Sequence, residues 1–398
     1  MIPFHDTQDV ETGRRPRQQA HGYDQARLNR VGERLREDIE AGRIHGAALM
    51  VSLHGEVILD FVSGYADKAS DRRLERDSVF ATMSVAKAIT NVLTLSLVEQ
   101  GLLRFHAPVA EVIQEFRKLG KQEVNLSHLM LHTAGLPQGL PPVAPEVLGS
   151  IEKLTAYVCD LPMVGIAGEQ VSYSMLVAQP VIAAMCLRVA GKGRNFATML
   201  KEEVFEPLGM HETSLGLRDD LAERLCPVRV AEPDPDTMIT DQVAQLLCTP
   251  GIELPAAAMF TTIADLHRFT EMLRRGGEIG GVRILSPAML RYGTRNYTGT
   301  MRNMVWDSIL SSRHWQPTPA ALGLGFHVRG EQPLPGQSRF GALNSPRAFG
   351  GFGAGSTGCW VDPDYDLGIS FLSTGLLEES RHVERTGLLS DMIISALV

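Results

Sequence analysis

Two periodicities of apolar residues mark the beginning of the chain. Between Tyr23 and Ala41 the apolar positions recur every three or four residues, which is the spacing of an amphipathic helix. These positions are Leu28, Val31, Leu35 and Ile39. Two apolar runs follow, Ala47–Leu53 and Val57–Val62, and His54-Gly55 separates them. A short turn between two such runs predicts a β-hairpin.

The middle of the chain predicts mostly helices, joined by proline-rich connections at Leu136–Pro145 and Pro233–Pro235. The predicted helices are Ser84–Gln100, Ile151–Val158, Leu176–Val189, Ala197–Val204 and Ile263–Arg274. Near the end, two apolar runs flank a turn with Pro363 at a favoured position. The expected elements there are strands at Gly358–Val361 and Leu367–Leu372 and a last helix from Glu379 to Leu397.

The order of these elements predicts an α/β (α+β) fold with one sheet built from both chain ends. Residues 1–22 are polar and aperiodic, and we expect them to form a flexible arm. We expect residues 23–105 and 295–398 to form the α/β sheet domain, with residues 106–294 as a mainly helical domain inserted into it. A cleft between two such parts is a preferred place for a site.

Composition limits the partners more than the fold. The 398 residues include 38 Lys+Arg and 46 Asp+Glu, a formal net charge of −8, and 44% are hydrophobic. This hydrophobic content predicts a globular chain rather than a disordered one. The acidic balance argues against nucleic acid as a partner, because phosphate binding needs clustered Lys and Arg.

The sequence indicates neither a membrane-spanning segment nor an export signal. No run approaches the roughly 18 apolar residues of a membrane span, and no apolar stretch follows the basic cluster Arg14–Arg17. We therefore expect a cytoplasmic protein with no membrane partner, and the sequence leaves its oligomeric state open.

Metal and disulfide chemistry also lack support. The twelve histidines contain no HExxH or HxH pair, so we expect no metal, and no motif calls for a cofactor. The five cysteines form no CxxC pair and are expected to be reduced core thiols. They are Cys159, Cys186, Cys226, Cys248 and Cys359.

A candidate nucleophile stands at the start of the most apolar predicted helix. Ser84 and Lys87 are three residues apart, so they share one face of that helix. Lys87 is the only charged residue between Ser84 and Val98, which predicts a helix buried nearly all round. Burial lowers the pKa of a lysine toward that of a usable base. The alternative is a capping serine beside a buried, paired lysine.

Other motifs are weaker. A second S-x-x-K pair, Ser150 and Lys153, resembles the N-cap of an exposed helix. Tyr173 can move a proton if it lies near a lysine, but a core or rim tyrosine is the alternative. The glycine-rich stretch Phe349–Ser356 allows close backbone approach to a ligand. Its glycines do not follow the dinucleotide-binding spacing, and no G-x-S-x-G elbow occurs.

Taken together, these segments resemble the serine β-lactamase/penicillin-binding-protein superfamily, in particular its class C-like (family VIII) carboxylesterases and transesterases. The resemblance extends from Leu28 to Phe371, and S-x-x-K is a superfamily motif. Supporting segments in the expected order are Asp77–Phe80, Leu129–Leu136, Ala258–Leu266, Gly281–Pro287 and Trp360–Pro363. It implies a β-lactamase/transpeptidase-like fold with a central antiparallel sheet and flanking helices.

The resemblance also implies a role for each matching residue. Ser84 would be the nucleophile, Lys87 would help deprotonate it, and Tyr173 would act as base for acylation and as acid toward the leaving group. The backbone N–H groups of Ser84 and Phe352 would form the oxyanion hole. Substrate contacts would come from Phe349, Gly350, Gly351 and Met175.

Two departures from the superfamily bear on the substrate. Met175 stands where the β-lactamases have Asn in Tyr-x-Asn, and Phe349-Gly350-Gly351 stands where they have Lys-Thr-Gly. Losing that lysine removes a cation for a substrate carboxylate, which favours a neutral ester.

The resulting hypothesis is a serine hydrolase that cleaves small-molecule carboxylic esters through an acyl-enzyme on Ser84. An acyltransferase passing the acyl group to an alcohol or amine is the first alternative, with an acyl carrier or acyl thioester as donor. A D-amino-acid amidase, peptidase or β-lactamase is the second, and a non-catalytic ligand-binding member is the third.

Overall fold

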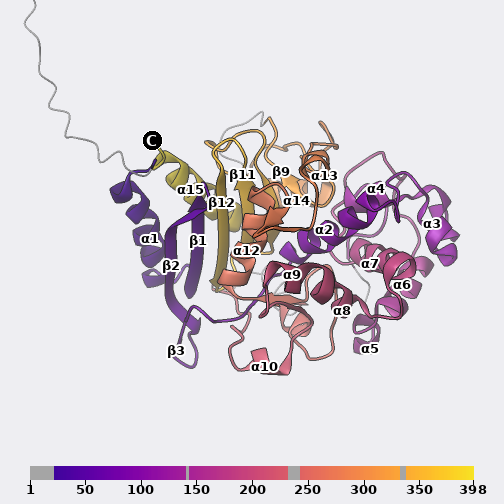
Figure 1. Cartoon of the computed structure of the whole chain (residues 1–398), viewed down its shortest axis with the longest axis horizontal. Helices are drawn as coiled ribbons and strands as arrows, with labels where there is room; N and C mark the ends of the chain where they lie inside the picture. The colour runs from indigo at the N-terminus through magenta and orange to yellow at the C-terminus, as the bar shows by residue number, and fades with distance from the viewer. Residues whose placement is uncertain (1–21, 140–142, 232–242, 332–337) are drawn as a thin grey trace, which may run out of the picture.

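The molecule is built around a seven-stranded antiparallel sheet that both ends of the chain share. The computed structural model describes residues 22–139, 143–231, 243–331 and 338–398 (Figure 1). The strand order is β3-β2-β1-β12-β11-β10-β9, so β1 pairs with β12 at the centre. The strands are β1 Gly46–Leu53, β2 Glu56–Asp67, β3 Arg72–Arg73, β9 His327–Val328, β10 Phe349–Gly353, β11 Thr357–Asp362 and β12 Leu367–Thr374. The predicted sheet from both chain ends is confirmed.

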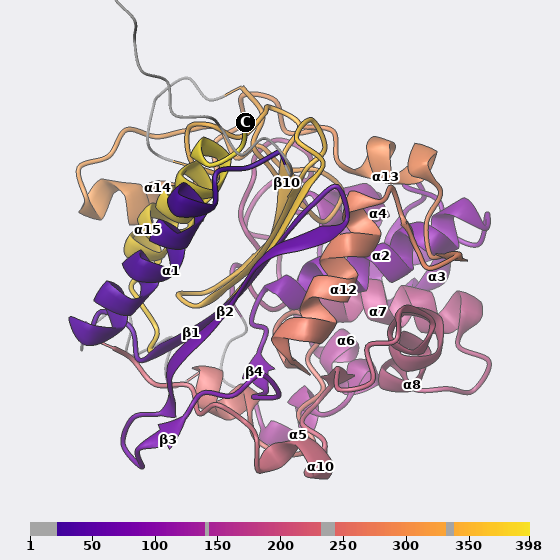
Figure 2. The ribbon, with the colours of Figure 1, turned by 60° about the vertical axis from the view of Figure 1, so that its left-hand side comes forward.

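Helices cover both faces of this sheet, as Figure 2 shows. The first and last helices, α1 (Gln25–Glu40) and α15 (Glu379–Ser395), lie on one face. On the other face lie α2 (Val85–Glu99) and α12 (Ile263–Arg274). In the central strands, neighbouring residues belong to different cores, because successive side chains of a strand point to opposite faces of the sheet. Leu49 thus belongs to the core that contains residues of α1 and α15, whereas its neighbour Ala48 belongs to the core that contains residues of α2 and α12.

Among the described residues, the remaining elements are shorter helices, 3₁₀ turns and two small sheets, and many of the helices lie at the right of Figure 1. The helices are α3 Val109–Val112, α4 Leu126–Met130, α5 Pro145–Leu148, α6 Ile151–Asp160, α7 Ala178–Ala190, α8 Phe196–Leu200, α9 Glu206–Leu208, α10 Asp219–Ala222, α13 Pro287–Gly293 and α14 Met304–Ser312. The 3₁₀ turns are Gln114–Arg117 and Lys121–Glu123. The small sheets contain β4 Phe80–Ala81, β5 Ser214–Leu215 and β6 Met259–Thr261, and the hairpin β7 Glu278–Ile279 with β8 Val282–Arg283.

Most predicted elements have bounds within about two residues of those in the structure, and two differ for a local physical reason. The strand predicted at Val57–Val62 continues to Asp67, because Gly64, at φ +93°, lets the backbone pass close to His45. A Cβ at Gly64 would lie 2.4 Å from the His45 carbonyl oxygen. The helix predicted at Ala197–Val204 is α-helical only to Leu200 and continues as a π-turn at Lys201–Phe205. Pro207 follows that turn and has no N–H to extend a regular helix.

Several expectations lie outside the described residues. They are the arm at residues 1–22 apart from Gly22, the basic cluster Arg14–Arg17, the connection Pro233–Pro235 and the middle of Leu136–Pro145. The division into domains stays a prediction. Helix α12, within the part predicted as the helical domain, packs against β12 of the sheet.

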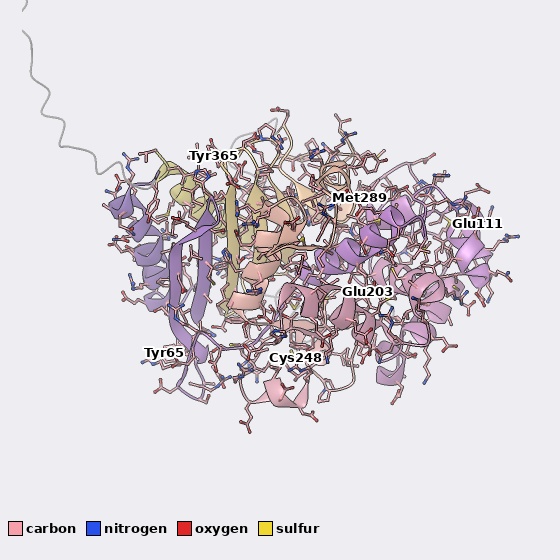
Figure 3. All side chains as sticks on the ribbon, viewed as in Figure 1. Tyr65, Glu111, Glu203, Cys248, Met289 and Tyr365 are labelled. Atoms are coloured by element: carbon pink, nitrogen blue, oxygen red, sulfur yellow. The ribbon has the colours of Figure 1, made fainter. Side chains whose placement is uncertain are left out.

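The cysteines are unpaired, as expected, but one of them is not a core residue. All five are free thiols, and four are buried. Cys248, labelled in Figure 3, is only half-buried at the edge of an apolar cluster. Within the described residues, no helix combines the length and apolar character needed to cross a membrane.

Candidate active site

Ser84 is held at the start of α2 with its hydroxyl free of any helix cap. It occupies the N-cap position, yet its side chain makes no capping hydrogen bond. The residue before it, Met83, has φ +50°, a sparsely populated conformation for a side chain of this kind. The turn is tied to β6 by the Thr82 N–H, which donates to the Met259 carbonyl at 2.8 Å. The Ser84 side chain therefore does not have the capping role that the sequence left open as an alternative.

Lys87 lies beside that hydroxyl and away from water. Its Nζ is 3.0 Å from the Ser84 Oγ and 3.0 Å from the Ala256 carbonyl oxygen. The residue is only 4% exposed, and none of the ion pairs among the described residues includes it. Burial lowers the pKa of Lys87 to about 7, because a low-dielectric surrounding disfavours the charged form. A large fraction of the amine is therefore neutral near neutral pH.

Tyr173 completes the group. The Lys87 Nζ lies 5.2 Å from the centre of the Tyr173 ring. Burial raises the pKa of Tyr173 to about 12, and a hydrogen bond with the Ser84 side chain offsets this only in part. The phenol is therefore neutral near pH 7, which makes it a proton donor and relay rather than a standing base.

The Tyr173 loop is positioned by His132, which the sequence analysis did not single out. The Ser174 N–H donates to the His132 Nδ1 at 3.0 Å, and the Ser172 N–H donates to the His132 carbonyl at 2.9 Å. The His132 and Tyr173 rings lie 4.3 Å apart between centres. Burial, and then the Lys87 charge, hold the pKa of His132 well below its usual value, so the ring stays neutral. Asn303 adds a contact, accepting the Tyr173 N–H at 3.4 Å.

Strand β10 approaches the Ser84 turn because it is rich in glycine. A Cβ at Gly351 would lie 3.1 Å from the Ala88 Cβ on α2, and one at Gly353 only 2.5 Å from the Thr82 carbonyl oxygen. Because these glycines have no side chains, helix α2 and the turn that carries Ser84 pack directly against β10. The groups that come close to the glycines are therefore parts of the protein itself. Phe352 lies between them and lines the same cavity as Ser84.

The remaining predicted site residues separate into two groups. Met175 is 43% exposed and lines the large cavity at Ser84, and Gly351 lines a second, small cavity of about 20 Å³ that Ser84 and Phe352 also line. Phe349 is 2% exposed and packs edge-on against Phe326. Phe349 and Gly350 are not among the described residues that line either cavity.

Ser150, the alternative S-x-x-K serine, is an N-cap. Its Oγ accepts the Lys153 N–H at 3.3 Å. This is the capping role that the sequence indicates for Ser150.

A cavity of about 460 Å³ opens from Ser84. Most of its lining is apolar and comes from loops and helices far apart in the sequence. Its apolar members include Met175, Leu176, Leu247, Trp306, Ile309, Pro319 and Phe340. The charged side chains among the described lining residues are Arg339 and Glu379, which the sequence analysis missed.

Comparison with known proteins agrees with this architecture. A family model described as Beta-lactamase matches residues 31–391, so the chain belongs to the beta-lactamase family. The esterase EstB of Burkholderia gladioli is 31% identical over 249 residues, which cover 58% of each protein.

Two solved structures share the fold over nearly their whole length. A penicillin-binding-protein homologue from Caulobacter crescentus has a TM-score of 0.76 at 23% identity, covering 93% of this chain and 98% of that one. A family VIII carboxylesterase has a TM-score of 0.73 at 20% identity, covering 91% and 97%. At these identities the likeness concerns the fold alone. The predicted fold class and superfamily are confirmed, and the superfamily is one of serine hydrolases that includes esterases and β-lactamases.

Proposed function

We propose that this protein is a serine esterase that forms an acyl-enzyme on Ser84. One observation carries the proposal: the buried Lys87 Nζ lies 3.0 Å from the hydroxyl of Ser84, which lines a large, mostly apolar cavity, and no ion pair among the described residues gives this lysine a carboxylate partner. A neutral amine at this distance can accept the hydroxyl proton, and an activated serine needs such a base.

The acylation step uses Lys87 as the base. The Lys87 lone pair takes the Ser84 proton while Oγ bonds to the ester carbon, and the carbonyl electron pair moves to the oxygen. The N–H groups of Ser84 and Phe352 would stabilise that oxyanion, each contributing about 2.7–4 kcal/mol if correctly placed. The intermediate then expels the alcohol, which receives a proton from the Tyr173 phenol. The Lys87 ammonium replaces that proton.

Deacylation reverses these steps with water as the nucleophile. Water loses its proton to the neutral Lys87 as it attacks the acyl carbon, and Ser84 leaves with a proton returned through Tyr173. The assignment differs from the family-based expectation, since the raised pKa of Tyr173 makes Lys87 the better base.

The cavity supports neutral esters with small or medium acyl groups. Its walls are mostly apolar side chains, which bind alkyl groups by excluding water. Phe349, in the position of the superfamily lysine, is buried in the core and offers no cation to a substrate carboxylate.

The test compares Ser84→Ala with Ser150→Ala. Only the first should lose labelling by a fluorophosphonate probe and turnover of p-nitrophenyl butyrate, by at least about a thousandfold. Ser150→Ala is the matched control, because that hydroxyl caps a helix. Full turnover by the Ser84 variant would refute the proposal.

Turnover assays with other acceptors and substrates separate the alternative functions. Added alcohol or amine that diverts most of the acyl group from water would make the protein an acyltransferase. Faster cleavage of D-amino-acid amides or a β-lactam than of matched esters would favour those substrates. A wild-type protein that binds the probe reversibly and turns over nothing would be a ligand-binding member.

A further inference from the structure

One ion pair interrupts the apolar wall of the large cavity. The Arg339 Nη2 donates to the Glu379 Oε1 at 2.5 Å, and both residues line the cavity together with Ser84 and Phe352. The two side chains are 14% and 22% exposed. A cation and an anion held in a mostly apolar cavity are costly to desolvate, so their position at the substrate cavity calls for an explanation.

Arg339 is fixed in place by more than its ion pair. Its guanidinium carbon lies 4.6 Å from the centre of the Trp306 ring and 5.5 Å from that of Phe352. Stacking of this kind holds the planar group in one orientation. The side chain therefore loses little conformational freedom when it binds a ligand.

Glu379 is fixed as well. Its Oε2 accepts the Gly355 N–H at 3.1 Å, and the residue lies in the first turn of α15, where the helix dipole favours a carboxylate. Gly355 follows β10, so this carboxylate ties the helix to the end of the strand that carries Phe352.

The pair leaves hydrogen-bond donors without adding net charge. A guanidinium has five N–H donors, and within the described part of the chain the bond to Glu379 is the one hydrogen bond found for Arg339. A substrate oxygen can accept one of the others. Because Glu379 neutralises the cation and would repel a second carboxylate, a neutral acceptor such as a ketone, amide or ester carbonyl fits better than an anion.

We propose that Arg339 is a substrate-recognition residue, and that the preferred substrates are esters with a second, neutral hydrogen-bond acceptor in the part that fills the cavity. The proposal rests on the esterase function proposed above. It assigns Glu379 two tasks, which are to orient Arg339 and to exclude anionic substrates.

The test uses matched substrates. p-Nitrophenyl esters of straight-chain acids ending in a methyl ketone are compared with the oxygen-free parent and with the terminal carboxylate of equal length, at three chain lengths. A second set carries the ketone in the alcohol part, as acetates of hydroxyketones and of the corresponding alcohols. For each protein, the ratio of kcat/KM between matched substrates is compared. The concentration of folded enzyme divides out of this ratio, so a variant that folds poorly can still be evaluated.

For the wild type, kcat/KM should be about tenfold higher for the ketone than for its oxygen-free parent, as expected for one hydrogen bond to a charged group. This preference should be seen at one chain length at least, in one of the two sets. Arg339→Met should bring that ratio to about one. Glu379→Gln keeps an oxygen for the Gly355 N–H but leaves Arg339 a net cation, so it should raise the carboxylate-to-ketone ratio by about tenfold or more. Arg347→Met, at an exposed arginine paired with Asp364 outside the cavity lining, is the control and should keep the wild-type ratios.

Two results would overturn the proposal. One is a ketone-to-parent ratio near one for the wild type in both sets. The other is an unchanged ratio in Arg339→Met, which would make the ion pair a purely structural link between α15 and the loop before β10. Either result leaves the esterase function intact, since that depends on the Ser84 variants.

Discussion

At the scale of single residues, the burial of Lys87 decides the chemistry of the site. An ammonium in this position would have little solvation beyond the Ala256 carbonyl and the Ser84 hydroxyl. The neutral amine avoids that cost and offers a lone pair to the serine proton. The same burial therefore lowers the pKa of Lys87 and makes it a base, and no ion pair in the described part of the chain gives it a carboxylate partner.

This gives a prediction for the pH dependence of acylation. Lys87 acts as a base only when it is neutral, so kcat/KM for p-nitrophenyl butyrate should fall as the pH drops through about 7, the pKa of Lys87. It should level off above that value. Initial rates between about pH 5.5 and 9 measure the profile.

Other titrating groups at the site would not give this inflection. Burial lowers the pKa of His327 to about 3 and holds that of His132 well below its usual value. His327→Gln should therefore keep the inflection, whereas Lys87→Met should lose most of the activity at every pH. A flat profile, or one that shifts in His327→Gln, contradicts the assignment of Lys87 as the base.

The residues that could be predicted are those belonging to a local pattern. Ser84 and Lys87 share one helix turn, and the family resemblance located Tyr173 and Phe352. Arg339 and Glu379 belong to none of the motifs found in the sequence, and His132 lies in Leu129–Leu136, a segment that supported the resemblance but was given no role at the site. They reach it through tertiary contacts, such as the Arg339–Glu379 pair between residues forty positions apart, and nothing local in the sequence specifies these contacts.

At the scale of elements, the packing of β10 against α2 places the strand beside the nucleophile. Gly353→Ala would put a Cβ 2.5 Å from the Thr82 carbonyl oxygen and 2.8 Å from the Met83 Cβ. The strand and the nucleophile turn must then separate. We expect a loss of about 1–3 kcal/mol in the free energy of unfolding, as for overpacked cores.

The same substitution should also reduce catalysis. Because Phe352 adjoins Gly353, a displaced strand moves the expected oxyanion donor relative to Ser84, and kcat should fall by tenfold or more. Urea unfolding and steady-state kinetics on p-nitrophenyl butyrate measure the two effects. A variant with the urea unfolding curve and the kcat of the wild type would show that β10 does not set the position of this turn.

One helix shows how a cap and a clear periodicity together define the bounds of an element. Helix α12 has the predicted bounds, and Thr262 caps it by accepting the Asp265 N–H at 3.3 Å. Strand β9 and the small sheet of β4, β6 and β5 were not predicted. Strands of two or three residues are too short to show alternation, and their pairing is set by distant partners.

At the scale of the whole molecule, the two chain ends are parts of one structure. Strand β12 lies between β1 and β11, and α1 packs beside α15. The described ends also meet directly, since the Val398 N–H donates to the Gly22 carbonyl at 3.0 Å. The fold therefore depends on contacts between residues more than three hundred positions apart. We expect these contacts to form equally well when the chain begins and ends at another position.

A circular permutant tests this view. Joining Val398 to Met1 leaves residues 1–21 as the connection to Gly22, and the new ends are placed between Gly280 and Gly281. Both glycines are exposed at the turn between β7 and β8, and neither is among the described residues that line the large cavity. Exposed turns tolerate new termini because few contacts are lost there.

The permutant should fold and keep kcat/KM for p-nitrophenyl butyrate within about threefold of the wild type. A chain lacking residues 367–398, in contrast, loses a central strand and should not fold. An insoluble or inactive permutant would mean that the order in which the elements are synthesised, and not their final contacts alone, is needed to build the sheet.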